Sequence, residues 1–562
     1  MEGLQRWTPG LVTLRHYERS WLRFDLIAGV VLAAILVPQG MAYAELAGLP
    51  PVTGLYTTIA CLVAYAVFGP SKVLVLGPDS SVSPLILASI TPLIVAGDPG
   101  SAIALAGMLA VLVGLIEIGL GLAKLGFVAD LLSSEVRVGY LNGLAITIIV
   151  GQLPKLFGFS TDADGFVDEL RAFVEGLDGR NRATLVTGVA VLVVLLVLPR
   201  LTTKVPAVLV AVIGVTIASA VLDLAADGVA TVGTLPKGFP TPSLPWTDAS
   251  DAVALLVGAV GITMVSLTDT IATASSFAAR RGDEVDADAE MIGVGTSNLA
   301  AGLFQGFAVS VSGSRSAVAD QAGARTQATG LVGAGLVALL LLVLNGLLAD
   351  LPQAALAAVV IAAALSLADV GAVMRFARLR RSSLVISLVA TGGVIFLGVL
   401  QGIVVAIVLA ILLFFRRSWW PHGAVLASVP SLGGWHSVDV HPEGDQVPGI
   451  VVYRWEAPLF FANAGQFRNQ VRRIVRERSP SYVVLQCEAI TDIDVTAADV
   501  LKDLDEELNA AGVHLAFVEL RDRLRDLIVR YELESTLDQE HFFPSIDEAV
   551  RVLAEERRDG EG

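Results

Sequence analysis

Long apolar runs recur between about Leu26 and Phe415, and they restrict the possible folds more than any other feature. Clear examples are Ile103–Leu120, Ala252–Val265 and Leu384–Phe415. A helix needs about 20 apolar residues to cross the core of a bilayer. The last run is long enough for two crossings, and we expect it to divide near Gly398–Gly402. The sequence therefore predicts a polytopic α-helical membrane protein of about 14 segments, some of them discontinuous.

The composition agrees with a lipid-facing surface and argues against several classes of protein. Only 16% of the residues are charged, whereas soluble globular proteins carry about 25%. The formal net charge of −16 argues against a nucleic-acid partner, which requires a basic surface. Two distant cysteines, Cys61 and Cys487, predict neither a disulfide nor a metal site. Because the sequence shows no nucleophile triad, metal cluster or cofactor loop, we expect neither an enzyme nor a bound cofactor.

The distribution of charge between the apolar runs predicts the orientation. Arginine and lysine gather at Arg6–Arg23, Arg200–Lys204, Arg280–Arg281, Arg375–Arg381 and Arg416–Arg417. The long loops near Asp162–Asp178 and Asp223–Asp251 are mostly acidic. The positive-inside rule places the arginine clusters in the cytoplasm. Both termini are then cytoplasmic, the number of crossings is even, and we expect a multi-pass protein of the plasma membrane.

The composition and the apolar pattern of the sequence change after Arg417. We divide the chain into a cytoplasmic segment (1–22), a membrane domain (23–417), a Pro/Gly/Trp-rich linker (418–448) and a small α/β domain (449–562). The strands expected in this last domain are Ile450–Trp455, Leu459–Phe461, Tyr482–Gln486 and His514–Glu519. Its expected helices are Ala464–Arg476, Thr496–Ala511, Leu524–Tyr531 and Ser545–Glu556.

A short motif occurs once in each half of the membrane domain, at Val73–Ser81 and at Val309–Ala317. Each copy is a β-like run followed by a glycine, polar residues and a stretch too short to span the bilayer. The serines that suit a helix N-terminus are Ser80, Ser81, Ser314 and Ser316. Paired interrupted segments of this kind mark the midplane site of transporters. Because two helix N-termini would offer unpaired N–H groups to one cavity, they favour an anion; the alternative is a pair of ordinary loops.

Two ionisable residues lie at membrane depth. Arg315 has no flanking cluster of charges, so it either faces a cavity, where it would favour an anion, or snorkels to the interface or pairs with a carboxylate. Asp269 follows the apolar run Ala252–Leu267, and Thr273 lies four residues later on the same helix face. That carboxylate and hydroxyl are suited to bind H⁺ or Na⁺. The alternative is that Asp269 is a structural partner of Arg315 or of free backbone N–H groups.

Asp79 occupies the position in the first motif that Arg315 occupies in the second. We expect Asp79 either to pair with Arg315 when the site is empty or to cap a helix. Pro38 should break or kink the first span. Gln39 and Tyr43 then lie near the freed backbone, where their polar groups could line a cavity; the alternative is a kink relieved only by packing.

At these residues the chain resembles the sulfate permease family. The match includes the long motif Pro38–Tyr56 and a second one at Gly306–Val318, followed by Gly323–Gln327. The family implies two inverted repeats of seven segments with two half-helices, a core and a gate that move relative to each other, and a C-terminal STAS domain. It also implies that the anion lies between the third and tenth helices. The substrate-binding residues predicted in this way are Gln39, Tyr43, Pro78, Asp79, Ser80, Ser312, Ser314, Arg315 and Ser316.

The resemblance also implies roles outside the anion site. Asp269 and Thr273 match the Asp and Thr with which some bicarbonate carriers of similar sequence bind Na⁺, whereas other members use a Glu and protons. In the STAS domain, the loop at Ile490–Asp499 resembles one that is phosphorylated in related proteins, here at Thr496; the simpler interpretation is that Asp494 or Thr496 caps the next helix. A homodimer and a cytoplasmic protein partner of the STAS domain are further expectations.

Together these features predict a secondary active transporter of a small oxyanion, with sulfate as the first choice. H⁺ or Na⁺ is the expected coupling ion, and an elevator-like movement is the expected mechanism. Bicarbonate and a C4-dicarboxylate are alternative substrates. An uncoupled anion channel or exchanger, and a membrane-anchored signalling protein in which only the STAS domain is active, are alternative functions. A nucleobase permease is disfavoured because those proteins have no STAS domain.

Overall fold

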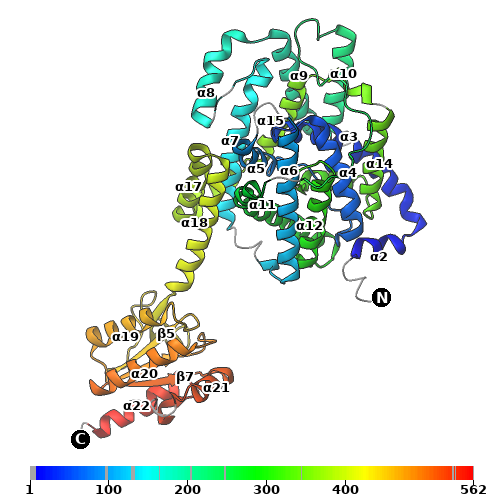
Figure 1. Cartoon of the computed structure of the whole chain (residues 1–562). Helices are drawn as coiled ribbons and strands as arrows, with labels where there is room; N and C mark the ends of the chain where they lie inside the picture. Colours follow the sequence, from blue (N-terminus) through cyan, green and yellow to red (C-terminus); the bar gives the residue numbers. More distant parts are fainter. Residues whose placement is uncertain are drawn as a thin grey trace. The chain divides into compact units, whose positions relative to one another are not determined.

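The computed structural model describes residues 8–94, 99–127, 133–161, 163, 165–202, 206–245, 248–343, 345–533, 537 and 539–560. The chain forms two compact units, Met1–Ala410 and Ile411–Gly562. The first is a bundle of apolar helices and the second a small α/β domain (Figure 1). They are called here the membrane unit and the C-terminal unit.

Among the described residues, fourteen helices make up the two halves of the membrane domain, in agreement with the predicted number of about 14 segments. Those of the first half are α3 (Leu22–Leu46), α4 (Pro51–Phe68), α5 (Ser83–Ile90), α6 (Pro99–Leu122), α7 (Ser134–Phe157), α9 (Arg182–Leu201) and α10 (Ala207–Leu222). Those of the second half are α11 (Ala249–Arg281), α12 (Ala287–Leu303), α13 (Gly313–Gln321), α14 (Ala328–Val343), α15 (Gln353–Leu367), α17 (Arg381–Leu397) and α18 (Val399–Trp419). Of three shorter helices, α2 (Pro9–Arg15) precedes α3, α8 (Phe166–Glu175) lies between α7 and α9, and α16 (Val370–Leu379) lies between α15 and α17.

The lengths of these helices agree with a bilayer. Seven helical segments of the described chain are long and apolar enough to cross a membrane, and α5, α10, α14, α17 and α18 contain shorter apolar stretches. Apolar side chains on their outer faces are exposed: Val186 of α9 is 69% exposed. The last apolar run divides as expected, because α17 ends at Leu397 and Gly398 has a φ of +98° before α18 begins. Pro38 does not break the first span, since α3 continues through it.

Helix packing follows an inverted repeat. The packing of α6 on α12 is matched by that of α14 on α4, and the packing of α7 on α17 is matched by that of α15 on α9. The two repeats meet where strand β1 (Leu76–Gly77) pairs antiparallel with β2 (Ser310–Val311). These strands are the β-like runs of the repeated motif, and the half-helices α5 and α13 follow them. The 7+7 fold with two half-helices is therefore confirmed.

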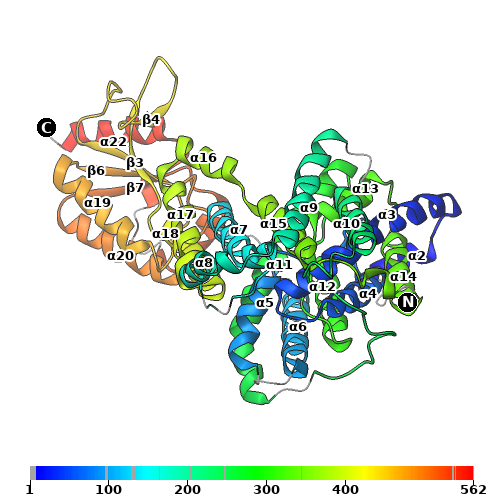
Figure 2. The ribbon, with the colours of Figure 1, turned by 90° about the horizontal axis from the view of Figure 1, so that it is seen from above.

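The membrane unit contains two groups of helices that pack mainly among themselves. The first group consists of α3, α4, α5, α6, α11, α12, α13 and α14. The second consists of α7, α9, α10, α15 and α17. In Figures 1 and 2, α7 and α17 lie side by side, away from α4 and α14. The main direct packing between the groups is that of α3 on α15 and, to a smaller extent, on α10.

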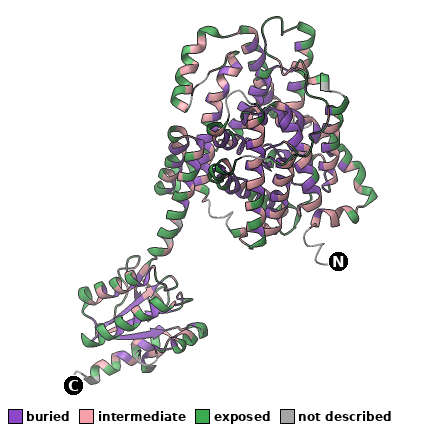
Figure 3. Cartoon of the chain, in the orientation of Figure 1, coloured by how far each residue is buried: buried purple, intermediate pink, exposed green. Residues whose placement is uncertain are grey.

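The C-terminal unit is a six-stranded sheet with the order β4-β3-β5-β6-β7-β8. Its strands are β3 (Gly423–Ser428), β4 (Trp435–Ser437), β5 (Ile450–Trp455), β6 (Tyr482–Gln486), β7 (His514–Val518) and β8 (Phe542–Phe543). Its helices are α19 (Ala464–Arg478), α20 (Val495–Ala510), α21 (Asp522–Arg530) and α22 (Ile546–Gly560). The central strands are buried between helices whose outer faces are exposed (Figure 3).

Two expectations for the C-terminal unit were wrong. The expected linker 418–448 contains β3 and β4, and β3 pairs with β5 inside the sheet. Ala424 and Leu426 of β3 are buried against the apolar face that α22 covers, so this segment belongs to the core of the domain. The expected strand Leu459–Phe461 reduces to one bridge between Leu459 and Ile493, because the chain turns at Phe461.

The close crossing of α3 and α4 provides a test of the packing. A Cβ on Gly54 would overlap the backbone carbonyl of Gly40. We expect Gly54→Ala to destabilise the protein by at least about 2 kcal/mol, because neither backbone can yield. The measurement is thermal unfolding of the purified protein in detergent.

Gly335→Ala is the matched control, because no atom lies within 4 Å of its added Cβ. This substitution should leave the unfolding temperature unchanged or raise it, since alanine favours a helix. Equal unfolding temperatures for Gly54→Ala and the wild type would contradict the packing described here.

Candidate functional site

A cavity of about 960 Å³ lies between the two groups of helices of the membrane unit. Most of the predicted site residues line it from the first group: Gln39, Tyr43, Asp79, Ser80, Asp269, Thr273, Ser312, Ser314 and Arg315. The second group closes the other side with α7, α9, α10 and α15. Residues separated by more than 270 positions thus share one cavity, because β1 and β2 pair beside it.

Arg315 is the most deeply buried charge of this cavity, with only 1% of its surface exposed. Its Nη1 donates a hydrogen bond of 2.6 Å to the backbone carbonyl of Pro78 in the other repeat. Gly77 provides the space, since a Cβ there would lie 3.3 Å from Nη1. Nε and Nη2 have no hydrogen-bond partner among the described residues. A buried guanidinium with unmatched donors is suited to receive an oxyanion.

The carboxylate of Asp79 lies near the guanidinium group of Arg315. Its Oδ2 is 3.8 Å from Nη2 of Arg315, which makes an ion pair that is longer than a hydrogen bond. Its Oδ1 accepts hydrogen bonds from the backbone N–H and the hydroxyl of Ser81, at 3.0 and 2.9 Å. Both alternatives for Asp79 are thus partly met, because one oxygen faces Arg315 and the other caps a local turn.

The two half-helices begin differently. Ser312 caps α13, with its Oγ 3.5 Å from the backbone N–H of Arg315 and 3.1 Å from Ser314 Oγ. In the first repeat the helix starts only at Ser83, one turn beyond Asp79, whose carbonyl accepts a hydrogen bond from the Ser83 N–H. Asp79 thus caps the turn that leads into α5, whereas the residue directly before the helix is Val82.

Two of the predicted residues take part in the site without lining the cavity. Pro78 contributes only its carbonyl, which holds Arg315. Ser316 is fully buried behind Arg315, and its Oγ accepts a hydrogen bond of 2.9 Å from the backbone N–H of Val75. Ser316 thus joins α13 to the approach of β1 and serves to position the site.

Asp269 and Thr273 line the cavity from α11. The charged groups of Asp79 and Arg137 line the same cavity as Asp269. A carboxylate and a hydroxyl that face the same cavity as Arg315 provide oxygen atoms for a coupling cation or a proton.

Sequence reasoning missed two arginines of the cavity, Arg137 of α7 and Arg280 of α11. Each lies close to the end of its helix, so it looked like an ordinary residue of the membrane interface. The cavity reaches them because it extends from the half-helices to the C-terminal end of α9, where Pro199 and Thr202 line it. Together these residues make the outer part of the cavity basic.

Buried carboxylates outside the cavity hold the strands in place. Asn298 of α12 donates a hydrogen bond of 2.8 Å to Glu117 of α6. The Asn298 side-chain oxygen accepts one of 2.8 Å from the backbone N–H of Val309. Glu117, a residue without a predicted role, thereby positions the residues that lead into β2 and Arg315.

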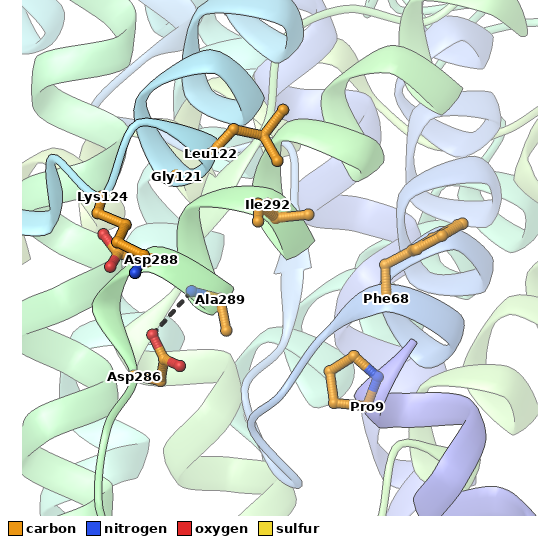
Figure 4. Close-up of a pocket in the computed structure, with 9 residues that line it drawn as sticks. All are labelled: Pro9, Phe68, Gly121, Leu122, Lys124, Asp286, Asp288, Ala289 and Ile292. Carbon is orange, nitrogen blue, oxygen red and sulfur yellow. Dashed lines mark hydrogen bonds between the residues drawn. The ribbon is translucent and has the colours of Figure 1, made fainter. Parts of the chain in front are cut away.

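A smaller cavity of about 250 Å³ contains none of the predicted residues (Figure 4). It lies at the start of α12, where the Asp286 carboxylate accepts a hydrogen bond of 3.0 Å from the Ala289 N–H. Lys124 and Asp288 also line it. Asp288 in turn accepts a hydrogen bond from the Gly126 N–H, so the polar groups here serve the local turns.

In the C-terminal unit, Asp494 caps α20 by accepting a hydrogen bond of 2.8 Å from the Ala497 N–H. Its second oxygen accepts another of 2.8 Å from the Phe461 N–H, which fixes the turn that replaced the expected strand. Thr496 is exposed in the first turn of α20 and does not cap it.

Comparisons with known proteins agree with this geometry. Residues 22–390 match the sulfate permease family, and residues 441–549 match the STAS domain. A probable sulfate transporter of Mycobacterium tuberculosis is 42% identical over 550 residues, which cover 97% of this chain and 98% of the relative.

Solved structures share the fold. A structure of SLC26A9 matches with a TM-score of 0.90 and 23% identity, over 100% of this chain and 94% of that one. The transmembrane domain of the cyanobacterial bicarbonate transporter BicA matches with a TM-score of 0.61 and 24% identity, over 70% of this chain and 98% of that one.

The unmatched donors of Arg315 generate a direct prediction. Arg315→Ala should weaken sulfate binding to the detergent-purified protein by roughly 10- to 150-fold, because hydrogen bonds to charged groups contribute about 1.5–3 kcal/mol. Isothermal titration calorimetry measures the change. Arg315→Lys should retain part of the affinity, since lysine keeps the charge but not the fork of donors.

Arg171→Ala is the control for loss of one positive charge, because Arg171 lies exposed on α8. It should bind sulfate like the wild type. If Arg315→Ala also binds sulfate with wild-type affinity, Arg315 is not part of the anion site.

Proposed function

Because the chain belongs to the sulfate permease family, we propose that this anion transporter is a secondary active carrier of sulfate, coupled to H⁺ or Na⁺. The observation that carries the proposal is the buried Arg315, which lines the cavity and whose Nε and Nη2 have no hydrogen-bond partner among the described residues. A tetrahedral oxyanion matches these donors and the N-terminus of α13. The probable sulfate transporter that is similar over nearly the whole chain favours sulfate over bicarbonate or a dicarboxylate.

We further propose that the structure is open to the cytoplasm. The cavity extends to Arg137, Arg280 and the loop that follows Arg200. These arginine-rich ends are cytoplasmic under the positive-inside rule, as are both termini. A basic outer cavity would raise the local concentration of anions near the site.

The two groups of helices support an elevator-like mechanism. Arg315, Asp79 and Asp269 all belong to the first group, so they would move together past the second. The groups are also joined by an ion pair of 3.8 Å between Glu45 of α3 and Lys155 of α7. Lys155 lies about 27 Å along α7 from Arg137. The ion pair therefore closes the end of the bundle opposite to the basic outer cavity.

The C-terminal unit is proposed to be regulatory. Thr496 is exposed within the first turn of α20, where a phosphate group would meet the positive end of the helix. A cytoplasmic protein that binds or modifies this turn is the partner we propose.

Uptake of labelled sulfate into proteoliposomes tests the function. We expect an inward gradient of either protons or Na⁺ to accelerate net uptake. In Asp269→Asn, the rate of gradient-driven net uptake should fall by about tenfold or more. Exchange of sulfate for sulfate should continue, because only the coupling group is removed. Uncoupled flux that tolerates Asp269→Asn would indicate a channel.

Two further outcomes address the substrate and the function. No sulfate uptake under any gradient by folded protein would exclude sulfate and direct the assay to bicarbonate and fumarate. No flux of any of these anions, in the wild type or in Arg315→Ala, would support a signalling protein that the helices only anchor.

Cross-linking tests the elevator. Cysteines that replace Glu45 and Lys155, joined by a short bifunctional methanethiosulfonate, should hold the two groups together and abolish net uptake until a reductant is added. The native Cys61 and Cys487 are buried, so the reagent should act at the new positions.

The matched control joins two positions of the same group. Arg281 of α11 and Asp320 of α13 form an ion pair within the first group. Cysteines there should cross-link without loss of uptake. Full uptake after cross-linking of positions 45 and 155 would contradict the relative movement of the two groups.

A further inference from the structure

We propose that Asp79 is a built-in counter-ion of Arg315 that the incoming oxyanion displaces, and that Asp79 takes up a proton as the oxyanion binds. Asp79 then determines both the affinity for the anion and the entry of one proton with it, in addition to any ion held at Asp269. This inference rests on the proposed function and deepens it.

The contact between Asp79 and Arg315 is suited to displacement. Arg315 is fixed by the 2.6 Å hydrogen bond from Nη1 to the Pro78 carbonyl, which does not involve Asp79. The 3.8 Å separation of Nη2 and Asp79 Oδ2 is too long for a hydrogen bond. An oxyanion that takes the place of Oδ2 would therefore leave the guanidinium in position and would accept hydrogen bonds from Nε or Nη2, for which the described residues supply no acceptor.

The Asp79 side chain is itself held on one oxygen only. Oδ1 accepts both hydrogen bonds from Ser81. Within the described chain, no hydrogen bond to Oδ2 accompanies them, although the side chain is only 13% exposed. Protonation at Oδ2 would convert this oxygen into a donor that faces the anion, without breaking the contacts of Oδ1.

The charges around Asp79 require compensation when a dianion enters. Asp79 faces Arg315 of α13, Asp269 of α11 and Tyr43 of α3, and Arg137 of α7 lines the same cavity. The two positive charges of Arg315 and Arg137 balance the two negative charges of Asp79 and Asp269 when all four groups are ionised.

Sulfate would add two negative charges to this partly buried site. Two anions that share one guanidinium repel each other strongly where water is limited. A proton on Asp79 removes the nearest repulsion and supplies a further hydrogen bond to the sulfate. The outer Arg280 lies about 16 Å along α11 from Asp269, too far to replace this effect.

The test is the pH dependence of sulfate binding to the purified full-length protein, measured by isothermal titration calorimetry between pH 5.5 and 8. In the wild type, ionised Asp79 competes with sulfate, so affinity should fall as the pH rises. In Asp79→Asn this competition is absent. The difference between the two affinities should therefore grow as the pH rises, and at pH 8 the variant should bind at least about tenfold more tightly, because one proton corresponds to a factor of ten per pH unit.

Two variants serve as controls. Asp79→Glu keeps the carboxylate and should keep the wild-type dependence on pH. Asp178→Asn removes a carboxylate from an exposed turn outside the cavity and should bind like the wild type. An Asp79→Asn variant that binds more weakly at every pH, or with the wild-type pH dependence, would overturn the proposal.

A second measurement needs no variant. Sulfate titrations of the wild type in buffers of different ionisation enthalpy give the number of protons taken up on binding. We expect at least one proton per sulfate, and one fewer in Asp79→Asn than in the wild type. Binding without proton uptake would overturn this inference and leave sulfate transport standing. No binding of sulfate at any pH would overturn both.

Discussion

The hydrogen bond from Arg315 to the Pro78 carbonyl is the contact on which the site depends. It joins the start of the second half-helix to the strand of the first repeat, directly beside the pairing of β1 and β2. Without it a buried guanidinium would lack an anchor, because the pair with Asp79 is longer than a hydrogen bond. The same bond leaves Nε and Nη2 free for a ligand. One contact therefore joins the two repeats and positions Arg315 for the proposed binding of an anion.

Buried polar groups surround this contact and make it rigid. Ser316 holds the chain before β1, and Asn298 with Glu117 holds the chain before β2. Each satisfies a backbone N–H that has no partner in a regular helix. All these residues belong to the first group of helices or its strands, whereas Arg137 approaches from the second. The site is thus built as a rigid part that could move past a separate wall.

Much of this arrangement could be predicted because its signals are local. The repeated glycine motif and a lone arginine in an apolar segment indicated where the half-helices meet. Pro84 also carried a signal that was overlooked: proline favours the first turn of a helix, which places the start of α5 at Ser83 and not at Asp79. Arg137 and β3 could not be predicted, because their roles arise only from tertiary packing and from pairing with β5.

The most direct test of the central claim is an experimental structure of the protein with bound selenate, a heavier analogue of sulfate that anomalous scattering can locate. The account predicts selenate within hydrogen-bond distance of Nε or Nη2 of Arg315, at the N-terminus of α13, with Nη1 still bound to the Pro78 carbonyl. Selenate bound elsewhere, with Arg315 still facing Asp79, would contradict it.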